Sequence, residues 1–274
     1  MKKEMYSSEV TLLRDTFRRL LRRHAKTNIV KLIDKTHPSD LALIFRYFND
    51  VEQDSIFSNM LASEETVKFL YELDESIATR LIENETPERL AKIMEQASSN
   101  EQVFLMGLVS DQFATSVIDL LQAEEQEELE EMMAYPEDSA GILMYTDVFT
   151  LHEETKAREA IYALQDQEDA EMVFYLYTLD DDGSLTGVIS LRDLVTTPGE
   201  TMLKDIMSKN IQAVRPETDQ EEVARIVSQY NFLAVPVVDA DEKLLGIVTV
   251  DSVVDVIREE ATEDFLQLAG AGKD

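Results

Sequence analysis

The sequence predicts an α+β protein in two parts: an all-α superhelical N-terminal domain, followed by a tandem pair of β-α-β-β-α units. Short helical segments fill residues 38–134, and the second half of the chain repeats itself once. Residues 143–163 align with 206–226 at an offset of 63, and residues 173–193 align with 232–252 at an offset of 59. A unit of about 60 residues that occurs twice usually buries the apolar face of each copy against the other.

Residues 1–37 are predicted to form a basic amphipathic helix. Its apolar side consists of Leu12, Leu13, Phe17, Leu20 and Leu21. Its basic flanks consist of Arg18, Arg19, Arg22 and Arg23. Such a helix packs on the neighbouring domain through its apolar side, or it contacts a membrane surface or a partner. We expect packing.

Residues 38–134 form the predicted superhelix. Each segment opens with a Ser, Thr or Asp start signal, and apolar residues then recur at helical spacing, as at Leu90, Ile93 and Met94. Units of about 10 to 13 residues are too short to be stable as isolated helices. We therefore expect them to stack on one another as in a solenoid.

The second half begins after Tyr135-Pro136, which ends the preceding helix. The first β-α-β-β-α unit is assigned to residues 135–200 and the second to residues 201–260, and residues 261–274 begin a further helix. Strands are expected at 147–151, 172–179, 185–190, 211–215, 232–238 and 244–249. The first copy carries four extra residues near Asp166 to Ala170, and its Asp181-Asp182-Gly183 is predicted to be a hairpin turn with a positive φ.

The composition excludes several classes of enzyme. The chain has no cysteine, so it has neither disulfides nor thiolate metal sites. Its eight glycines form no phosphate-binding loop of the Walker or dinucleotide type, and its three histidines are far apart. No serine lies in a nucleophile elbow. We expect no catalytic activity. Without a signal sequence or a run of 18 apolar residues, the chain as given is expected to be soluble and cytoplasmic.

The net charge of −31 is unevenly distributed. Residues 1–37 contain ten basic and four acidic residues, a net charge of +6, so the remaining residues have a net charge of −37. An acidic body of this kind repels nucleic acid and anionic lipid and attracts cations, or it serves only to keep the protein soluble. The positions of the carboxylates must decide between these interpretations.

Several motifs resemble known families. GVISLRD (187–193), GIVTVDS (246–252) and VPVVD (235–239) look like a pair of cystathionine-β-synthase (CBS) domains. Over roughly residues 36–268 the chain is similar to MgtE-type magnesium transporters. The motifs that carry this second resemblance are YPEDSAG (135–141), SLRDL (190–194), TDQEEVAR (218–225) and ATEDF (261–265).

In the MgtE family, a cytosolic superhelical N domain and a CBS pair precede a connecting helix and a membrane pore. The resemblance implies that this chain is the Mg²⁺-sensing regulatory region at the cytoplasmic face of the cell membrane, with its transmembrane pore domain outside the given sequence. It also implies a homodimer through the CBS domains, and Mg²⁺ bound between acidic domain faces to stabilise the closed state. No nucleic-acid partner is expected.

Carboxylates at helical spacing mark the last helix. Asp251 and Asp255, Asp255 and Glu259, and Glu260 and Asp264 are like-charged pairs four residues apart, which destabilise an isolated helix. Acids in the last turns also oppose the helix dipole. This crowding indicates either an external cation or a solvated face.

The resemblance implies a set of Mg²⁺ ligands or acceptors near the metal. Thr218 and Glu221 fit a capping box, which needs no metal, whereas the resemblance makes the acids of this segment part of a Mg²⁺ site. Asn231 and Ser252 each stand where the family commonly has Asp. At the second of these positions, Asp251 could substitute for the missing carboxylate. The metal candidates are Gly141 (through its carbonyl), Asp219, Glu221, Asn231, Asp251, Asp255, Glu260 and Asp264. Mg²⁺ suits scattered oxygen ligands because it retains several waters.

A nucleotide subsite is implied by the same resemblance. Many CBS pairs bind adenine nucleotides such as ATP through the Asp of an S/T-x-x-D stretch, which is Asp193 here, and Arg192 could pair with a phosphate. The alternative is that both residues are an ordinary N-terminal pair of a helix. The second copy has Ser252 at the equivalent position. The alternative function is therefore a freestanding CBS-pair regulator that binds an adenine nucleotide.

Overall fold

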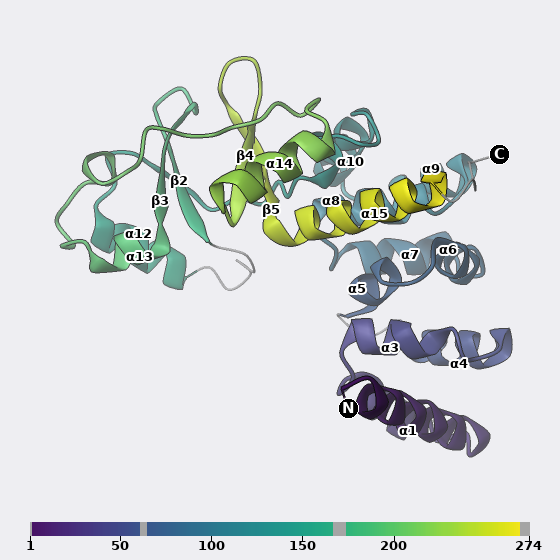
Figure 1. The fold of residues 1–274 in the computed structure, drawn as a ribbon. Coiled ribbons are helices and arrows are strands. Elements are labelled where there is room, and N and C mark those ends of the chain that lie inside the picture. Colours follow the sequence, from purple (N-terminus) through teal and green to yellow (C-terminus); the bar gives the residue numbers. More distant parts are fainter. Residues whose placement is uncertain (1, 61–64, 167–173, 269–274) are drawn as a thin grey trace. The chain divides into compact units, whose positions relative to one another are not determined.

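The computed structural model describes residues 2–60, 65–166 and 174–268, without the side chains of residues 2–8, 259 and 261–268. The chain folds into two compact units, Met1–Leu129 and Glu130–Asp274. Figure 1 shows helices alone in the first unit and strands with helices in the second. Among the described residues, no helix is both long enough and apolar enough to cross a lipid bilayer.

The first unit is all-α, which confirms the fold class predicted for this half. Its elements are α1 (Lys2–Arg22), α2 (Lys26–Ile33), α3 (Pro38–Phe45), α4 (Asp50–Met60), α5 (Thr66–Tyr71), α6 (Glu75–Glu83), α7 (Pro87–Met94), α8 (Ser99–Gly107), α9 (Asp111–Ile118) and α10 (Ala123–Met133), the last of which reaches into the second unit.

Local signals set where these short helices begin, and packing stabilises them. Pro38 and Pro87 lie at the first position of α3 and α7, where a missing N–H costs nothing. The side chains of Phe45 and Phe69 are fully buried. Their rings meet edge to face with centroids 4.9 Å apart, a favourable aromatic geometry.

The basic N-terminal segment is two helices rather than the single helix predicted over residues 1–37. α1 ends at Arg22 and α2 begins at Lys26, and between them His24 has a φ of 50°. The expected packing of α1 is confirmed at Phe17, whereas Leu12, which was predicted on the same apolar side, is 68% exposed. Phe17 is fully buried against Phe48, with ring centroids 6.2 Å apart.

The second unit contains two sheets that belong to the two sequence copies. Its elements are α11 (Ala140–Leu143), β1 (Thr150–His152), α12 (Ala157–Gln165), β2 (Tyr175–Leu179), β3 (Leu185–Ser190), α13 (Leu191–Thr196), the 3₁₀ helix η1 (Leu203–Asp205), α14 (Gln220–Tyr230), β4 (Ala234–Val238), β5 (Leu244–Thr249) and α15 (Val250–Leu268). In the first sheet, β1 pairs in parallel with β2, and β2 pairs antiparallel with β3. In the second sheet, β4 pairs antiparallel with β5.

The two copies exchange backbone contacts in a pseudo-twofold manner. Tyr145 of the first copy forms a bridge to Ile247 of the second, and Ser208 of the second forms the equivalent bridge to Val188 of the first. The partners correspond at the sequence offsets of 63 and 59. Each copy therefore extends the sheet of the other, as the repeat predicts.

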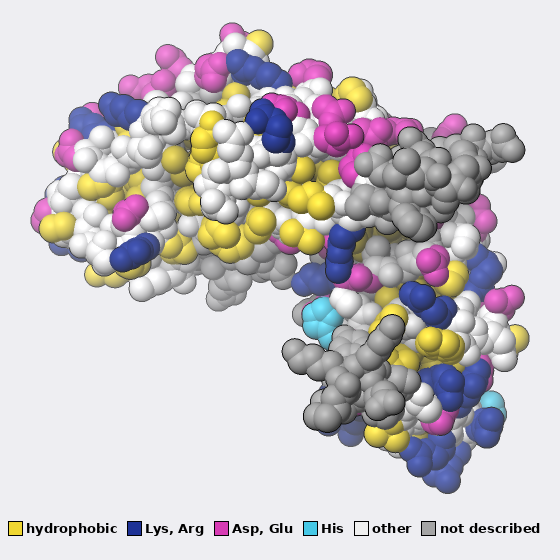
Figure 2. Space-filling model, viewed as in Figure 1, with side chains coloured by type: hydrophobic (Ala, Val, Ile, Leu, Met, Phe, Trp, Pro, Cys, Tyr) yellow, Lys and Arg dark blue, Asp and Glu magenta, His cyan; other side chains and the backbone are white. Residues whose placement is uncertain are grey.

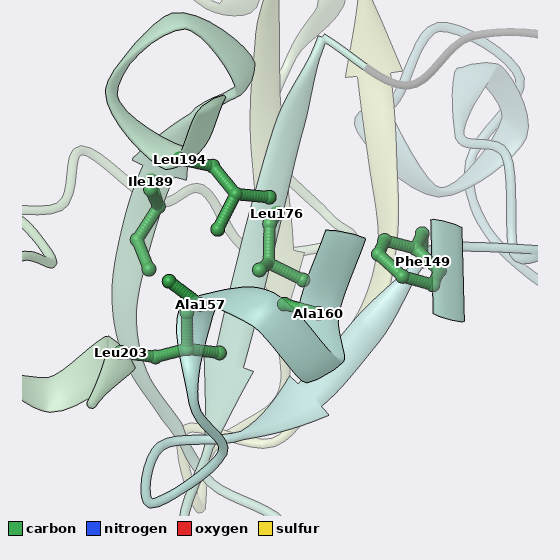
Figure 3. Packing of buried hydrophobic residues seen from close by; sticks show 7 residues of the cluster. All are labelled: Phe149, Ala157, Ala160, Leu176, Ile189, Leu194 and Leu203. Carbon is green, nitrogen blue, oxygen red and sulfur yellow. The ribbon is translucent and has the colours of Figure 1, made fainter. Parts of the chain in front are cut away.

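Apolar residues fill each copy and the space between the two sheets. Figure 3 shows the core of the first copy, in which residues of β2, β3, α12 and α13 meet. Its buried members are Phe149, Ala157, Ala160, Leu176, Ile189, Leu194 and Leu203. A second cluster joins Tyr177 of β2 to Ala234 and Ile247 of the other sheet. The copies thus bury apolar faces against each other.

Two local predictions have different outcomes. The strand expected at 211–215 is only an isolated bridge between Val214 and Val237. In the first copy the N–H of Tyr177 donates to the carbonyl of Phe149, but the equivalent residue of the second copy is Pro236, which has no N–H. The hairpin turn is confirmed, because Gly183 has a φ of 80°. The four extra residues near Asp166 to Ala170 lie largely outside the described residues.

Candidate metal-binding region and nucleotide subsite

Helices α14 and α15 lie side by side and run antiparallel. At one end, the backbone N–H of Val250 donates to the carbonyl of Leu233, just after α14. At the other end, the side-chain amide of Gln220 donates to a carboxylate oxygen of Glu260 over 2.8 Å. Gln220 is only 8% exposed, and Glu260 is half-buried. This bond fixes the eleventh residue of α15 to the first turn of α14.

Several predicted metal ligands lie around that first turn of α14. Asp219 and Glu221 flank Gln220 in sequence, and the bond from Gln220 brings Glu260 to the same end of the helix pair. The N–H of Gly141 donates to the carbonyl of Pro216 over 2.8 Å, which places the start of α11 there too. The structure therefore gathers Gly141, Asp219, Glu221 and Glu260 in one region of the second unit.

The carboxylates in this region also have local structural roles. Asp219 is the N-cap of α14, and its carboxylate accepts from the N–H of Glu221 over 2.9 Å. The predicted capping box with Thr218 as the cap is wrong by one residue, since the Thr218 hydroxyl accepts instead from the N–H of Arg215. Gly141 has a packing role as well, because a Cβ there would lie 2.5 Å from the ring of Tyr135.

The other predicted ligands lie elsewhere. Asn231 is the C-cap of α14 in the left-handed conformation, with a φ of 54°, a position that favours asparagine without any metal. Asp251 is exposed in the first turn of α15, nine residues from Glu260, or about 13 Å along the helix. Asp255 lies between them, 3.5 Å from Arg258. The side chain of Asp264 lies outside the described part of the structure.

No complete metal site is formed within the described side chains, where no group of three or more His, Asp or Glu residues is placed to hold an ion. The donor chemistry nevertheless suits a hard cation, because carboxylate and carbonyl oxygens are the ligands that Mg²⁺ takes. The pKa of Tyr135 indicates a negative local potential. Burial raises this pKa, and the charges of Glu131, Glu217 and Asp239 raise it further.

The candidate nucleotide residues lie at the start of α13. The hydroxyl of Ser190 donates to the Asp193 carboxylate over 2.7 Å and accepts from the Asp193 N–H over 3.1 Å. Arg192 and Asp193 are both exposed. This geometry is an ordinary helix cap, and it also holds an accessible carboxylate in a fixed position.

The equivalent position in the second copy has different chemistry. Thr249 and Ser252 correspond to Ser190 and Asp193 at the offset of 59, and their hydroxyls lie 3.3 Å apart. Both side chains are buried, with exposures of 0% and 6%. The two copies therefore offer one exposed carboxylate and one buried hydroxyl pair.

Gln220 was not among the residues predicted for this region, because the prediction there was based on the acids, the helix cap and a backbone carbonyl. The spacing of apolar residues in α14 does indicate that Gln220 is buried. Gln220, Val223, Ala224 and Val227 are the buried residues of α14, at the i, i+3, i+4, i+7 spacing of a buried helix face. A polar residue on such a face requires a hydrogen-bond partner.

Comparisons with known proteins agree with this architecture. The MgtE intracellular N domain matches residues 36–138, and the CBS domain matches residues 140–199 and 203–259. The magnesium transporter MgtE of Enterococcus faecalis is 43% identical over 149 residues, which are 54% of this chain and 33% of that protein. MgtE of Bacillus subtilis is 29% identical over 244 residues, 89% of this chain and 54% of that protein.

Solved structures extend the likeness over most of the fold. A crystal structure of the cytosolic domain of the Mg²⁺ channel MgtE in complex with ATP has a TM-score of 0.83 and 30% identity, and the match covers 89% of this chain and 99% of that one. The chain spans about a third to a half of the length of the curated relatives. It belongs to the MgtE family and corresponds to the non-enzymatic part that consists of the intracellular N domain and the CBS pair.

Proposed function

We propose that this chain is the Mg²⁺-sensing regulatory region of a magnesium transporter, located at the cytoplasmic face of the membrane. Bound Mg²⁺ neutralises acidic faces of the two units, draws the units together and stabilises the closed state of a pore in the longer protein. The observation that supports this best is the hydrogen bond from Gln220 to Glu260, which collects Asp219, Glu221 and Glu260 at one end of the α14–α15 pair.

The driving force is repulsion between carboxylates. Two carboxylates about 6 Å apart in a medium of effective dielectric near 20 repel by roughly 3 kcal/mol. Several such pairs keep acidic faces apart until a divalent cation binds. Mg²⁺ needs only one or two carboxylates, because water fills the rest of its coordination shell. An incomplete set of protein ligands is therefore compatible with the proposal.

Helix α15 provides the connection to the rest of the transporter. It begins at Val250, immediately after β5 ends at Thr249, so its start is fixed by the CBS sheet. Gln220 then fixes it again at Glu260. A change in charge at the first turn of α14 is thus transmitted to the following turns of α15. In the longer protein those turns lead toward the pore.

Calorimetric titration with Mg²⁺ tests the metal part of the proposal. The triple variant Asp219→Asn, Glu221→Gln, Glu260→Gln should lose heat of binding and affinity. The matched control variant carries the same change in net charge on exposed hairpin turns: Asp181→Asn, Asp182→Asn, Asp241→Asn. Equal losses of Mg²⁺ affinity in both variants would show that only the net charge of the chain matters, and would refute the assignment of the site.

A role for adenine nucleotide is the second candidate. The exposed Asp193 carboxylate, fixed by Ser190, supports it, because a carboxylate in this position can accept from ribose hydroxyls. Calorimetry with ATP in the presence of a chelator should show binding, and Asp193→Asn should weaken it. Binding of ATP with no response to Mg²⁺ would favour a freestanding nucleotide-responsive module over the metal sensor.

A homodimer through the CBS pair is part of the same proposal. Val195 and Val254, which correspond at the offset of 59, are 62% and 45% exposed. Ile257 is exposed beside Val254 on α15. Apolar side chains repeated on both copies are suited to a symmetric interface. Sedimentation analysis should show a dimer, and Val254→Asp should shift it toward monomer.

A further inference from the structure

The first two helices carry a strongly basic surface on a strongly acidic chain. We define the basic face as the exposed side chains of Arg19, Arg22, Arg23, Lys26, Lys31 and Lys35. Between residues 19 and 35 the only acid is Asp34, whereas the whole chain has a net charge of −31. Figure 2 shows dark-blue side chains gathered where Figure 1 places α1.

Packing fixes the direction in which α1 presents these charges. Phe17 is fully buried, so the opposite side of the helix faces outward. Leu12, Arg19 and Arg23 are spaced at i, i+7 and i+11, which places them together on that outward side. Leu12 is 68% exposed, and Val30 of α2 is 37% exposed. The outward side of α1 therefore carries the apolar Leu12 among its cations.

The cations of the basic face differ from the other arginines of α1. Arg14 pairs with Asp15 at 2.8 Å, and Arg18 pairs with Glu52 at 3.2 Å. The six residues of the basic face form no ion pair with any side chain that the structure describes. Within the described residues, the Arg19 side chain donates one hydrogen bond, of 3.3 Å, to the Thr16 hydroxyl. This charge is therefore available to an anionic partner.

We propose that the basic face of α1 and α2 docks on an anionic lipid bilayer. Headgroup phosphates complement the guanidinium and ammonium groups, and the boundary of the acyl chains can accommodate Leu12 and Val30. Nucleic acid offers phosphates as well, but it has no comparable place for exposed aliphatic side chains. The acidic remainder of the chain opposes binding only weakly, because charges beyond about 10 Å are screened at 0.1 M salt.

This inference goes beyond the proposed metal response, and binding to vesicles tests it independently of Mg²⁺. The chain is mixed with vesicles of phosphatidylcholine alone, or of phosphatidylcholine with phosphatidylglycerol, in a chelator that prevents divalent ions from bridging acids to lipid. Bound protein is measured by co-sedimentation. We expect binding only to the anionic vesicles. It should disappear when salt is raised to about 1 M, where the Debye length is about 3 Å.

Two matched triple variants locate the effect. Each basic residue near an anionic surface strengthens binding by about fivefold, so Arg19→Gln, Arg22→Gln, Arg23→Gln should weaken it by about a hundredfold. The control variant Lys92→Gln, Lys209→Gln, Lys243→Gln removes the same charge from exposed positions outside the basic face and should bind normally. Circular dichroism should show both variants folded.

Three results would overturn the proposal. The first is no binding to anionic vesicles, and the second is equal weakening in the two triple variants. The third is that the protein does not bind vesicles but self-associates, and that the α1 variant abolishes this self-association. The basic face would then bind the acidic surface of a second copy.

Discussion

The Tyr177 hydroxyl should destabilise the fold, and its removal should therefore stabilise the protein. The side chain is 1% exposed between the two sheets, and its hydroxyl has no hydrogen-bond partner among the described residues. Burial of such an unsatisfied group costs about 1–3 kcal/mol. Tyr177→Phe should raise the free energy of unfolding by that amount, and the Tm of the second unit by about 3 °C per kcal/mol.

A second tyrosine on the same face of β2 provides the control. The hydroxyl of Tyr175 accepts from the N–H of Leu233 over 3.3 Å. Tyr175→Phe should therefore lower the free energy of unfolding by about 1 kcal/mol. Urea denaturation followed by circular dichroism measures both variants. A Tyr177→Phe protein that is less stable than the parent would refute the reasoning, because the hydroxyl would then have a partner.

The pH dependence of the free energy of unfolding, compared between the parent and Tyr177→Phe, provides a further check. Burial raises the pKa of its phenol above the ordinary value of 10.0. The folded state therefore favours the neutral phenol of Tyr177. The stability of the parent is unaffected by this group below pH 10.0 and falls as the pH rises above that value, because the phenol ionises more readily in the unfolded chain. The stability advantage of Tyr177→Phe over the parent should grow above pH 10.0.

Three further substitutions test the contacts between copies and between helices. A Cβ at Gly246 would lie 2.6 Å from the Tyr145 carbonyl oxygen, so Gly246→Ala should destabilise by about 1–3 kcal/mol in urea unfolding. At the equivalent position of the first copy, a Cβ at Gly187 would lie 2.7 Å from the Met207 Cβ, so Gly187→Ala should cost a similar amount. An unchanged free energy of unfolding in either variant would contradict the close contact between the copies. Gln220→Ala should lower the free energy of unfolding by about 1–2 kcal/mol and speed amide hydrogen exchange in the residues after Glu260. Unchanged exchange in these residues would show that the hydrogen bond does not hold α15 in place.

The sequence repeat predicted the architecture of the second unit because two similar copies have equivalent apolar faces to bury. Residues related by the offsets of 63 and 59 occupy equivalent places, as the bridges of Tyr145 and Ser208 show. The turn at Gly183 was predictable because glycine adopts a positive φ without strain. Its counterpart in the second copy, Glu242, has a φ of 62° and pairs with Arg215, which no local pattern indicates.

Local departures from the prediction have identifiable causes. Pro236 interrupts the ladder that the alignment implied, because it has no N–H to donate. The break at His24 could not be read from the sequence, because neither glycine nor proline marks it and histidine only occasionally takes a positive φ. The cap of α14 is Asp219 rather than Thr218, a difference of one residue that propensity cannot resolve.

The candidate site was only partly predictable. The acids of α14 and α15 were identified from charge spacing and family resemblance. Their grouping depends on the antiparallel packing of the two helices, which the spacing within each helix does not specify. That packing brings Glu260 to Asp219 through Gln220 and leaves Asn231 and Asp251 at the opposite end of α14.

Small-angle X-ray scattering of the chain with and without Mg²⁺ tests the central claim most directly. We predict that millimolar Mg²⁺, compared with a chelator at equal ionic strength, lowers the radius of gyration, and that the triple variant at Asp219, Glu221 and Glu260 responds less. A radius of gyration that does not change with Mg²⁺ in the parent protein would contradict the proposed metal-driven approach of the two units.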